Sequence, residues 1–124
     1  MIKPIPTEAQ EQMAVFEWAE WNMTKYPELA LMFHIPNESN VPVQYRVKLK
    51  KMGLKSGVPD ICLPVARGQY HALYIEMKRT KGSTTSDAQK WTIAKLNKAG
   101  NIAIICKGAE QAIENIIEYL KGEN

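Results

Sequence analysis

Residues 60–78, DICLPVARGQYHALYIEMK, predict a β-hairpin around which we expect the rest of the chain to be organised. Two apolar runs, residues 61–65 and 70–78, are each typical of a strand. They flank residues 66–69, a four-residue connection of a length common in hairpins. The central strands of the fold are therefore predicted to be antiparallel neighbours.

The same hairpin predicts a pair of facing carboxylates. Side chains alternate between the two faces of a strand, so Glu76 and Lys78 share one face. Folding the hairpin about its loop places Asp60 opposite residue 75 or residue 76, and in the second register Asp60 and Glu76 are cross-strand neighbours. Facing carboxylates repel each other unless a cation lies between them. Oxygen ligands without Cys or His favour Mg²⁺ or Mn²⁺ over zinc.

Helices and further strands are predicted on both sides of the hairpin. Capping-box patterns at Thr7/Gln10 and Ser86/Gln89 predict helices over residues 8–23 and 86–99. The remaining expected elements are a strand at 31–35, a turn at 37–40, a short basic helix at 43–52, a strand at 102–106 buried on both faces, and a final helix marked by Ile113, Ile116, Ile117 and Leu120. This order predicts an α/β fold in which a mixed central sheet is sandwiched by helices.

Acidic side chains interrupt the apolar side of the first helix. At 100° per residue, Glu8, Glu11 and Gln12 fall within the sector that contains Val15 and Ala19. A carboxylate in such a position must be paired or bound to metal. Either Glu8 or Glu11 is therefore a candidate for a functional acid.

Positive charge is concentrated in the middle third of the chain. Residues 1–40 carry two basic and six acidic side chains, residues 41–82 carry nine basic and two acidic, and residues 83–124 carry five of each. This asymmetry predicts a surface that faces an anion. The candidate phosphate-binding residues are Arg46, Lys48, Lys50, Lys51 and Lys55.

Length and composition favour one domain spanning residues 1–124. The chain is 45% hydrophobic and 23% charged, which is ordinary for a globular protein. It contains no apolar run long enough to span a membrane and begins without the apolar region of a signal peptide, so we expect a cytoplasmic protein. Cys62 and Cys106 both lie in apolar runs and are expected to be core residues.

Several segments, taken in order, resemble the VRR-NUC family within the Pro-Asp…(Asp/Glu)-x-Lys nuclease superfamily. The matching segments are Thr7-Glu8-Ala-Gln-Glu-Gln12, Ile35-Pro-Asn37-Glu38, Gly53-Leu-Lys-Ser-Gly57-Val-Pro59-Asp60, Tyr74-Ile-Glu76-Met-Lys78 and Ser86-Asp-Ala-Gln89 with Leu96 and Gly100. The resemblance extends from residue 7 to about residue 108. Because the order and the spacing of the motifs agree together, the resemblance is more specific than any one motif.

This resemblance implies a restriction-endonuclease-like fold and an active site of Glu8, Asp60, Glu76 and Lys78, with Gln89 close by. Asp60 and Glu76, with the backbone carbonyl of Met77, would hold Mg²⁺ or Mn²⁺, and Glu8 would bind a second cation or its water shell. Glu8 matches the family pattern better than Glu11, since it precedes Gln12 by four residues.

The expected function is that of a metal-dependent DNA endonuclease, in a bacterial or phage-infected cell. The alternatives are a non-catalytic DNA-binding module that retains the fold, and an interaction protein with an acidic partner. Small family members resemble resolvases, which favours branched or four-way DNA and a homodimer. Trp18, Trp21, Met23 and the final helix could supply its interface, whereas Tyr45 and Tyr70 are expected mainly to pack and Trp91 to lie in the core or an interface.

Overall fold

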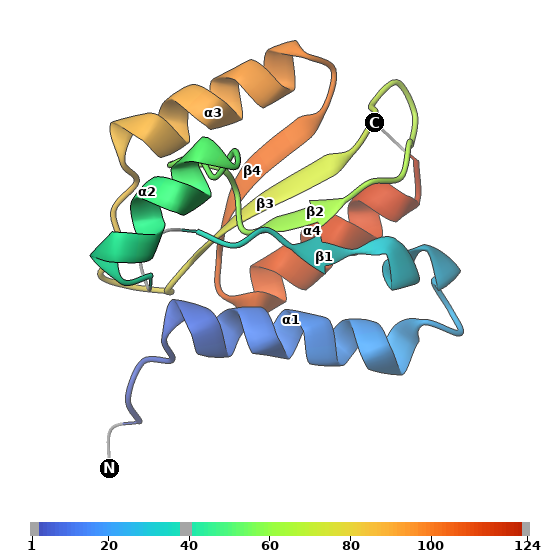
Figure 1. Cartoon of the computed structure of the whole chain (residues 1–124). Coiled ribbons are helices and arrows are strands. Elements are labelled where there is room, and N and C mark those ends of the chain that lie inside the picture. The colour runs from blue at the N-terminus through green and yellow to red at the C-terminus, as the bar shows by residue number, and fades with distance from the viewer. Residues whose placement is uncertain (1–2, 38–40, 123–124) are drawn as a thin grey trace.

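The computed structural model describes residues 3–37 and 41–122, and within them the chain forms one sheet with helices around it (Figure 1). Of the expected turn at 37–40, only Asn37 lies among these residues, and Glu38 of the matching motif lies outside them. The elements in chain order are α1 (Glu8–Asn22), the 3₁₀ helix η1 (Pro27–Leu31), β1 (Phe33–His34), α2 (Val43–Lys51), β2 (Ile61–Leu63), β3 (Leu73–Lys78), α3 (Asp87–Lys98), β4 (Ile102–Lys107) and α4 (Ala109–Leu120).

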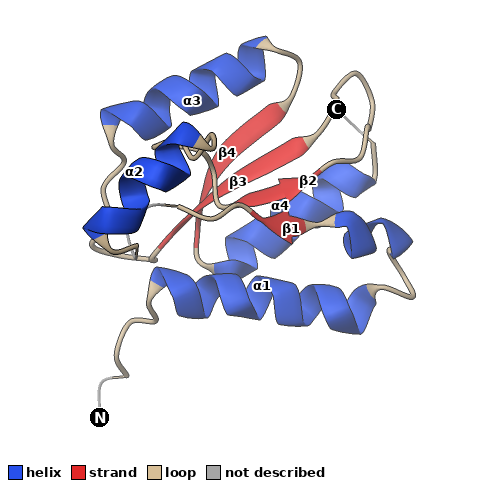
Figure 2. Ribbon diagram, viewed as in Figure 1, coloured by secondary structure: helices blue, strands red, loops and turns tan. Residues whose placement is uncertain are grey.

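The sheet is mixed and lies between two layers of helices. Its strand order is β1-β2-β3-β4, with antiparallel pairing from β1 to β3 and parallel pairing between β3 and β4. Helices α1 and α4 lie against one face, and α2 and α3 lie on the other side (Figure 2). The predicted α/β architecture is confirmed. No helix of the described residues is long and apolar enough to cross a membrane.

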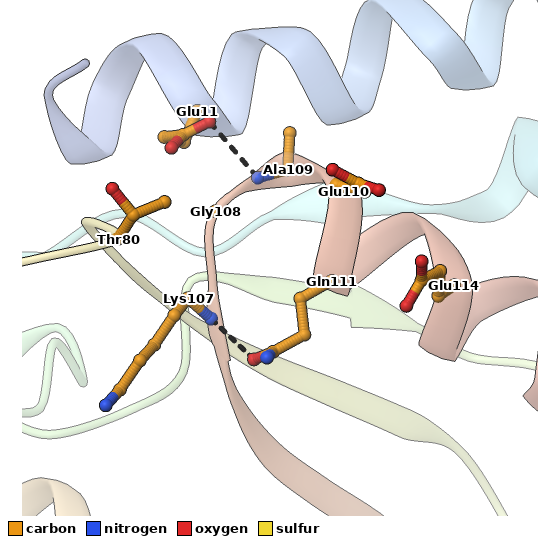
Figure 3. Close-up of a pocket in the computed structure, with 8 residues that line it drawn as sticks. All are labelled: Glu11, Thr80, Lys107, Gly108, Ala109, Glu110, Gln111 and Glu114. Atoms are coloured by element: carbon orange, nitrogen blue, oxygen red, sulfur yellow. Dashed lines mark hydrogen bonds between the residues drawn. The ribbon is translucent and has the colours of Figure 1, made fainter. Parts of the chain in front are cut away.

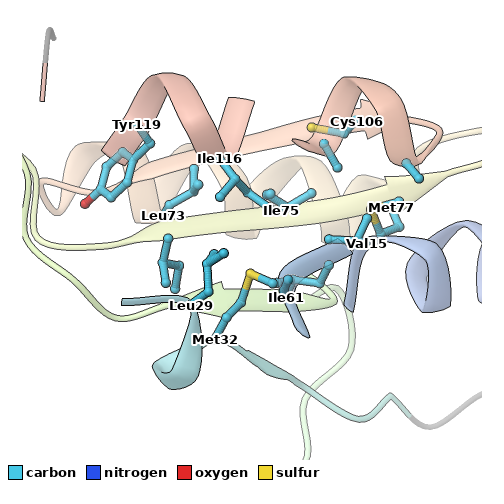
Figure 4. Packing of buried hydrophobic residues seen from close by; sticks show 14 residues of the cluster. Val15, Leu29, Met32, Ile61, Leu73, Ile75, Met77, Cys106, Ile116 and Tyr119 are labelled. Carbon is cyan, nitrogen blue, oxygen red and sulfur yellow. The ribbon is translucent and has the colours of Figure 1, made fainter. Parts of the chain in front are cut away.

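The core occupies the face of the sheet that α1 and α4 cover. Leu73, Ile75 and Met77 of β3 are buried there, together with Val15 of α1 and Ile116 of α4 (Figure 4). Each fully buried side chain of this kind contributes about 1.5–3 kcal/mol. The alternation predicted for β3 therefore holds, and it leaves the opposite face of that strand for polar groups.

The register of the hairpin is the second of the two predicted. Ile61 pairs with Ile75, so the position before Ile61 is opposite Glu76. Both strands are shorter than predicted: β2 ends at Leu63 because Pro64 has no N–H to donate to the ladder. A separate bridge between Arg67 and Tyr70 closes the loop.

Two other strands differ from expectation. The predicted strand at 31–35 is reduced to β1, because the chain leaves η1 only at Leu31 and meets Pro36 soon after. The β4 strand is at an edge of the described sheet, and only Ala103 and Cys106 of its residues are buried. It is not enclosed on both faces as predicted. Cys62 and Cys106 are both buried and free, as expected.

Most of the apolar surface expected to serve an interface instead packs within the chain. Ile116 of α4 is fully buried, and Ile113 and Leu120 pack against the same core. Trp18 is half-buried and lies 6.3 Å, between ring centroids, from Tyr26. Trp21 differs, because 81% of it is exposed. Trp91, on α3, is also exposed rather than in the core.

The free edge of β4 is covered by side-chain amides. Asn97 of α3 donates to the Ala103 carbonyl at 3.0 Å and accepts from the Ala103 N–H at 2.9 Å. Gln111 of α4 accepts from the Lys107 N–H at 2.7 Å. Unpaired strand edges are templates for pairing with another chain, and the two amides occupy positions that such a strand would use.

Replacing Asn97 with Ala should destabilise the protein and expose the edge. Loss of its two bonds to Ala103 should lower the free energy of unfolding by about 1–3 kcal/mol, the range for leaving backbone groups unsatisfied. Urea denaturation measures this, and light scattering during heating should show earlier aggregation. The exposed neighbour Lys98→Ala is the control, expected to stay within about 0.5 kcal/mol of wild type. Equal stability of the two variants would contradict the prediction.

Candidate active site

Glu76 and Lys78 are buried polar residues on the non-core face of β3. Glu76 is 3% exposed and Lys78 is 6% exposed. Lys78 Nζ lies 3.5 Å from Glu76 Oε2. Buried polar groups need hydrogen-bonding partners, and each of these side chains lies within reach of the other.

Asp60 is held rigidly just before β2. Its Oδ2 accepts a hydrogen bond of 2.7 Å from the Met77 N–H. Its backbone carbonyl accepts from the Ile35 N–H at 2.7 Å and from His34 Nδ1 at 2.8 Å. Within an extended strand the N–H and C=O of one residue point to the same neighbour, so the Met77 carbonyl also faces the Asp60 side. The structure thus brings together the three groups expected to bind metal.

Gln89 connects the buried pair to the start of α3. Its Oε1 accepts from Lys78 Nζ at 3.1 Å and from the Ser86 N–H at 2.9 Å, and its Nε2 donates to Glu76 Oε2 at 2.9 Å. The predicted capping box is therefore present, and the same Gln89 side chain also contacts Lys78 and Glu76. Gly57 makes this possible, because a Cβ there would lie 2.6 Å from the Ala88 carbonyl group.

An open cleft of about 280 Å³ lies over these groups. Glu8 lines it together with Asp60, Glu76, Lys78 and Gln89, so the five residues expected from the resemblance converge. A second hollow of about 320 Å³ shares Glu8 and Asp60 and is also lined by Gln12 and His34. The two hollows are adjoining parts of the same polar surface, reached from the first turn of α1.

Glu11 does not line the cleft and instead contacts the start of α4. Its Oε1 accepts from the Ala109 N–H at 3.2 Å, at the start of α4 (Figure 3). Gly108 is the N-cap of that helix and has no side chain to perform this task. A Cβ at Gly108 would lie 3.2 Å from Glu11 Oε2. Glu11 therefore fastens α1 to α4, which accounts for its inward position on the helix.

Burial and mutual repulsion dominate the electrostatics of the carboxylates. Burial, followed by the charge of Asp60, raises the pKa of Glu76 to about 8, against the opposing effect of Lys78. Burial also raises the pKa of Asp60, while the Met77 N–H and the nearby His34 and Lys78 oppose the rise. A site that destabilises its own carboxylate charges in this way favours a cation.

The donor set fits a hard divalent cation. Among the described residues, no three or more His, Cys, Asp and Glu side chains are grouped so that they could hold a metal ion. Mg²⁺ does not need such a group, since it is usually held by one or two carboxylates and completes its shell with water and phosphate. Asp60 and Glu76 would supply those carboxylates, and the Met77 carbonyl is a further oxygen on the same side.

The residues predicted to hold phosphate lie on and after α2. Lys48, Lys50, Lys51 and Lys55 have exposed side chains, whereas Arg46 is half-buried and donates to the Val41 carbonyl at 3.2 Å. Helix α2 is followed by the loop whose residues Ser56, Gly57 and Val58 line the cleft. The basic segment and the carboxylates are therefore close along the chain.

Sequence reasoning missed the part that His34 plays at the site. It lines the second hollow and donates to the Asp60 carbonyl. Asn37 lines both hollows, although the sequence identified it only as part of a turn that resembles the family motif. The pairing of β1 with β2 could have identified His34, but a two-residue strand is too short to be predicted from alternation.

Comparison with known proteins identifies a family. The model of the "VRR-NUC domain" matches residues 6–110. A solved structure described as a "VRR_NUC domain protein" superposes with a TM-score of 0.82 at 34% identity, over 98% of this chain and 93% of that chain. A search of curated proteins found no match.

In the absence of divalent cations, the free energy of unfolding should fall as the pH rises from about 4.5 to about 8. The pKa of Glu76 is about 8 in the folded chain, whereas the ordinary pKa of a Glu carboxyl is 4.5, so between these values the folded state holds a proton that the unfolded state releases. The loss is at most about 1.4 kcal/mol per pH unit. Urea denaturation in EDTA measures it. Glu76→Gln, which keeps an oxygen for Gln89, should flatten the dependence; an unchanged slope would contradict the assignment.

Proposed function

The chain belongs to the VRR-NUC family of nucleases, and from that premise we propose that it is a Mg²⁺- or Mn²⁺-dependent DNA endonuclease. The observation that supports this most directly is the convergence of Asp60, Glu76, Lys78 and Gln89 in one cleft, held by direct hydrogen bonds. We propose action in the cytoplasm of a bacterial or phage-infected cell, by one catalytic domain.

Asp60 and Glu76 would hold the ion, with the Met77 carbonyl as a third oxygen. When bound, the ion polarises the scissile phosphate and lowers the pKa of a water molecule. Because the pKa of the Glu76 carboxyl is raised to about 8, this residue must lose its proton to act as a ligand. Metal affinity should therefore increase with pH through the neutral range.

Lys78 would orient the attacking water and offset the negative charge that develops on the phosphorus oxygens. Its Nζ is confined by Gln89 and Glu76, at 3.1 Å and 3.5 Å, so the ammonium group is positioned before substrate arrives. Gln89 in turn is fixed by the capping box of α3. Gln89 thus positions Lys78 and the Glu76 carboxylate relative to each other.

Glu8 would act at the outer side of the cleft, through the water shell of the ion or a second cation. It is exposed, and its negative charge contributes to the raised pKa of Glu76. Glu11 is bound to Ala109 at the start of α4, which supports Glu8 for this role. Lys48, Lys50, Lys51 and Lys55 would contact the DNA backbone, with Arg46 steadying the start of α2.

Asp60→Asn and Lys78→Ala should each abolish cleavage while leaving DNA binding within a few-fold of wild type. The Asn side chain retains an oxygen for the Met77 N–H, so the loss would report the missing charge. Removal of a positioned catalytic group typically reduces the rate by about 10²–10⁴-fold. Nicking of labelled plasmid with Mg²⁺ or Mn²⁺ measures this, with the exposed Lys90→Ala as control. Near wild-type cleavage by either variant would refute the assignment, and binding without cleavage by the wild type would favour a non-catalytic module.

We further propose that the substrate is branched DNA and that the enzyme is a homodimer. A four-way junction is two-fold symmetric, and cutting opposed strands requires two sites related by the same symmetry. Trp21, which is exposed on α1, is the remaining candidate from the apolar residues first considered for an interface. Aromatic residues of this kind often contribute most to subunit association.

The expected result is a dimer at micromolar concentration that makes paired nicks in four-way junctions and cuts linear duplex poorly. Sedimentation velocity and junction cleavage gels test the two halves separately. Trp21→Ala should shift sedimentation toward the monomer. An active wild-type monomer would exclude the dimer, and equal cleavage of linear and branched DNA would exclude the structural preference.

A further inference from the structure

Helix α2 exposes apolar side chains beside its basic ones. None of its nine residues, all of them described, is buried. Tyr45 is 57% exposed, and Met52, the C-cap, is 72% exposed. Tyr45 was expected to pack, and the structure corrects that expectation. A helix normally buries its apolar side chains, so this exposure requires a separate explanation.

The exposed apolar side chains border a groove. Its volume is about 530 Å³, and it is lined by Val41, Pro42, Tyr45, Lys48, Leu49 and Met52. Volumes of this size are typical of sites that take a small organic group. Tyr45 supplies an aromatic face and Met52 a flexible thioether, which packs well against aromatic rings.

The charge of α2 indicates what such a group would be attached to. The helix contains Arg46, Lys48, Lys50 and Lys51 and has no acidic residue. Lys48 also lines the groove itself. An occupant that is planar and apolar at one end and anionic at the other matches this surface. An unstacked nucleotide has both properties, a base with an exposed face and a phosphate on either side.

The groove is close to the cleft along the chain. Gly57, which lines the cleft, is five positions after Met52 at the end of the groove, so their Cα atoms are at most about 18 Å apart. This length corresponds to about five nucleotides at 3.4 Å per nucleotide. The close packing of Gly57 on Ala88 fixes the end of this segment.

We propose that the groove of α2 binds an unpaired base of the DNA substrate, stacked on Tyr45, on the strand that runs to the cleft. The inference rests on the proposed nuclease function and adds a basis for substrate choice. In continuous duplex each base is already stacked and paired, so the groove could be filled only by breaking those interactions. A single-stranded flap, a gap or a junction offers a base without that loss.

The test measures binding in EDTA, where cleavage does not interfere. The probes are a linear duplex and the same duplex with a single-stranded overhang containing 2-aminopurine, whose fluorescence is quenched by stacking. Tyr45→Ala should weaken overhang binding by about 5- to 150-fold, the range for loss of one base–aromatic contact, and should abolish the added quenching. Duplex binding should change less than about twofold, and Tyr45→Phe should retain wild-type behaviour.

Val47→Ala is the matched control, because Val47 is an exposed apolar residue of the same helix that does not line the groove. Equal loss on both DNAs, or no loss on either, would overturn the inference. The inference would also be overturned if Tyr45→Ala weakened binding to vesicles of equal phosphatidylserine and phosphatidylcholine but left DNA binding unchanged. If the wild-type protein binds neither DNA, the proposed nuclease function fails. If it binds both DNAs and Tyr45→Ala binds them equally well, only this inference fails.

Discussion

The pairing of Ile61 with Ile75 determines both the hydrophobic core and the carboxylate site of this molecule. On one face of β3 it directs apolar side chains into the core with α1 and α4, and this burial supplies the stability of the fold. On the other face it places Asp60 and Glu76 against each other, where like charges and burial oppose ionisation. A shift of one residue would exchange the two faces, so the core holds the carboxylates in an arrangement that they would not adopt alone.

Helices from both layers complete the charged side of the sheet. Gln89 of α3 bonds with Lys78, Glu76 and its own helix start, so that a local capping interaction also orders the site. On the other layer, Glu11 joins α1 to α4 while Glu8, one turn earlier, faces the cleft. The two acids at the start of α1 therefore have separate positions: Glu11 secures the helix, and Glu8 is exposed and lines the cleft.

The hairpin, the helices and the facing carboxylates could be predicted because each depends on local pattern or strand alternation. Capping boxes located α1 and α3 to within a residue or two, and alternation assigned Glu76 and Lys78 to one face. Other features depend on contacts between distant segments. The bond from Glu11 to Ala109 and the contact of His34 with Asp60 have no local signature. The enclosure of β4 was overestimated because an apolar run does not reveal whether a strand lies at an edge.

The amide bonds between Asn97 and Ala103 also have a consequence for the order in which the chain is made. Synthesis proceeds from the N-terminus, so α3 leaves the ribosome before β4 does. The side chain that covers the start of this edge, at Ala103, is thus already synthesised when the strand emerges. Gln111, which covers the end at Lys107, follows only with α4. The start of the edge strand therefore has its covering amide available before the end does, and an uncovered edge is a template for pairing with neighbouring chains.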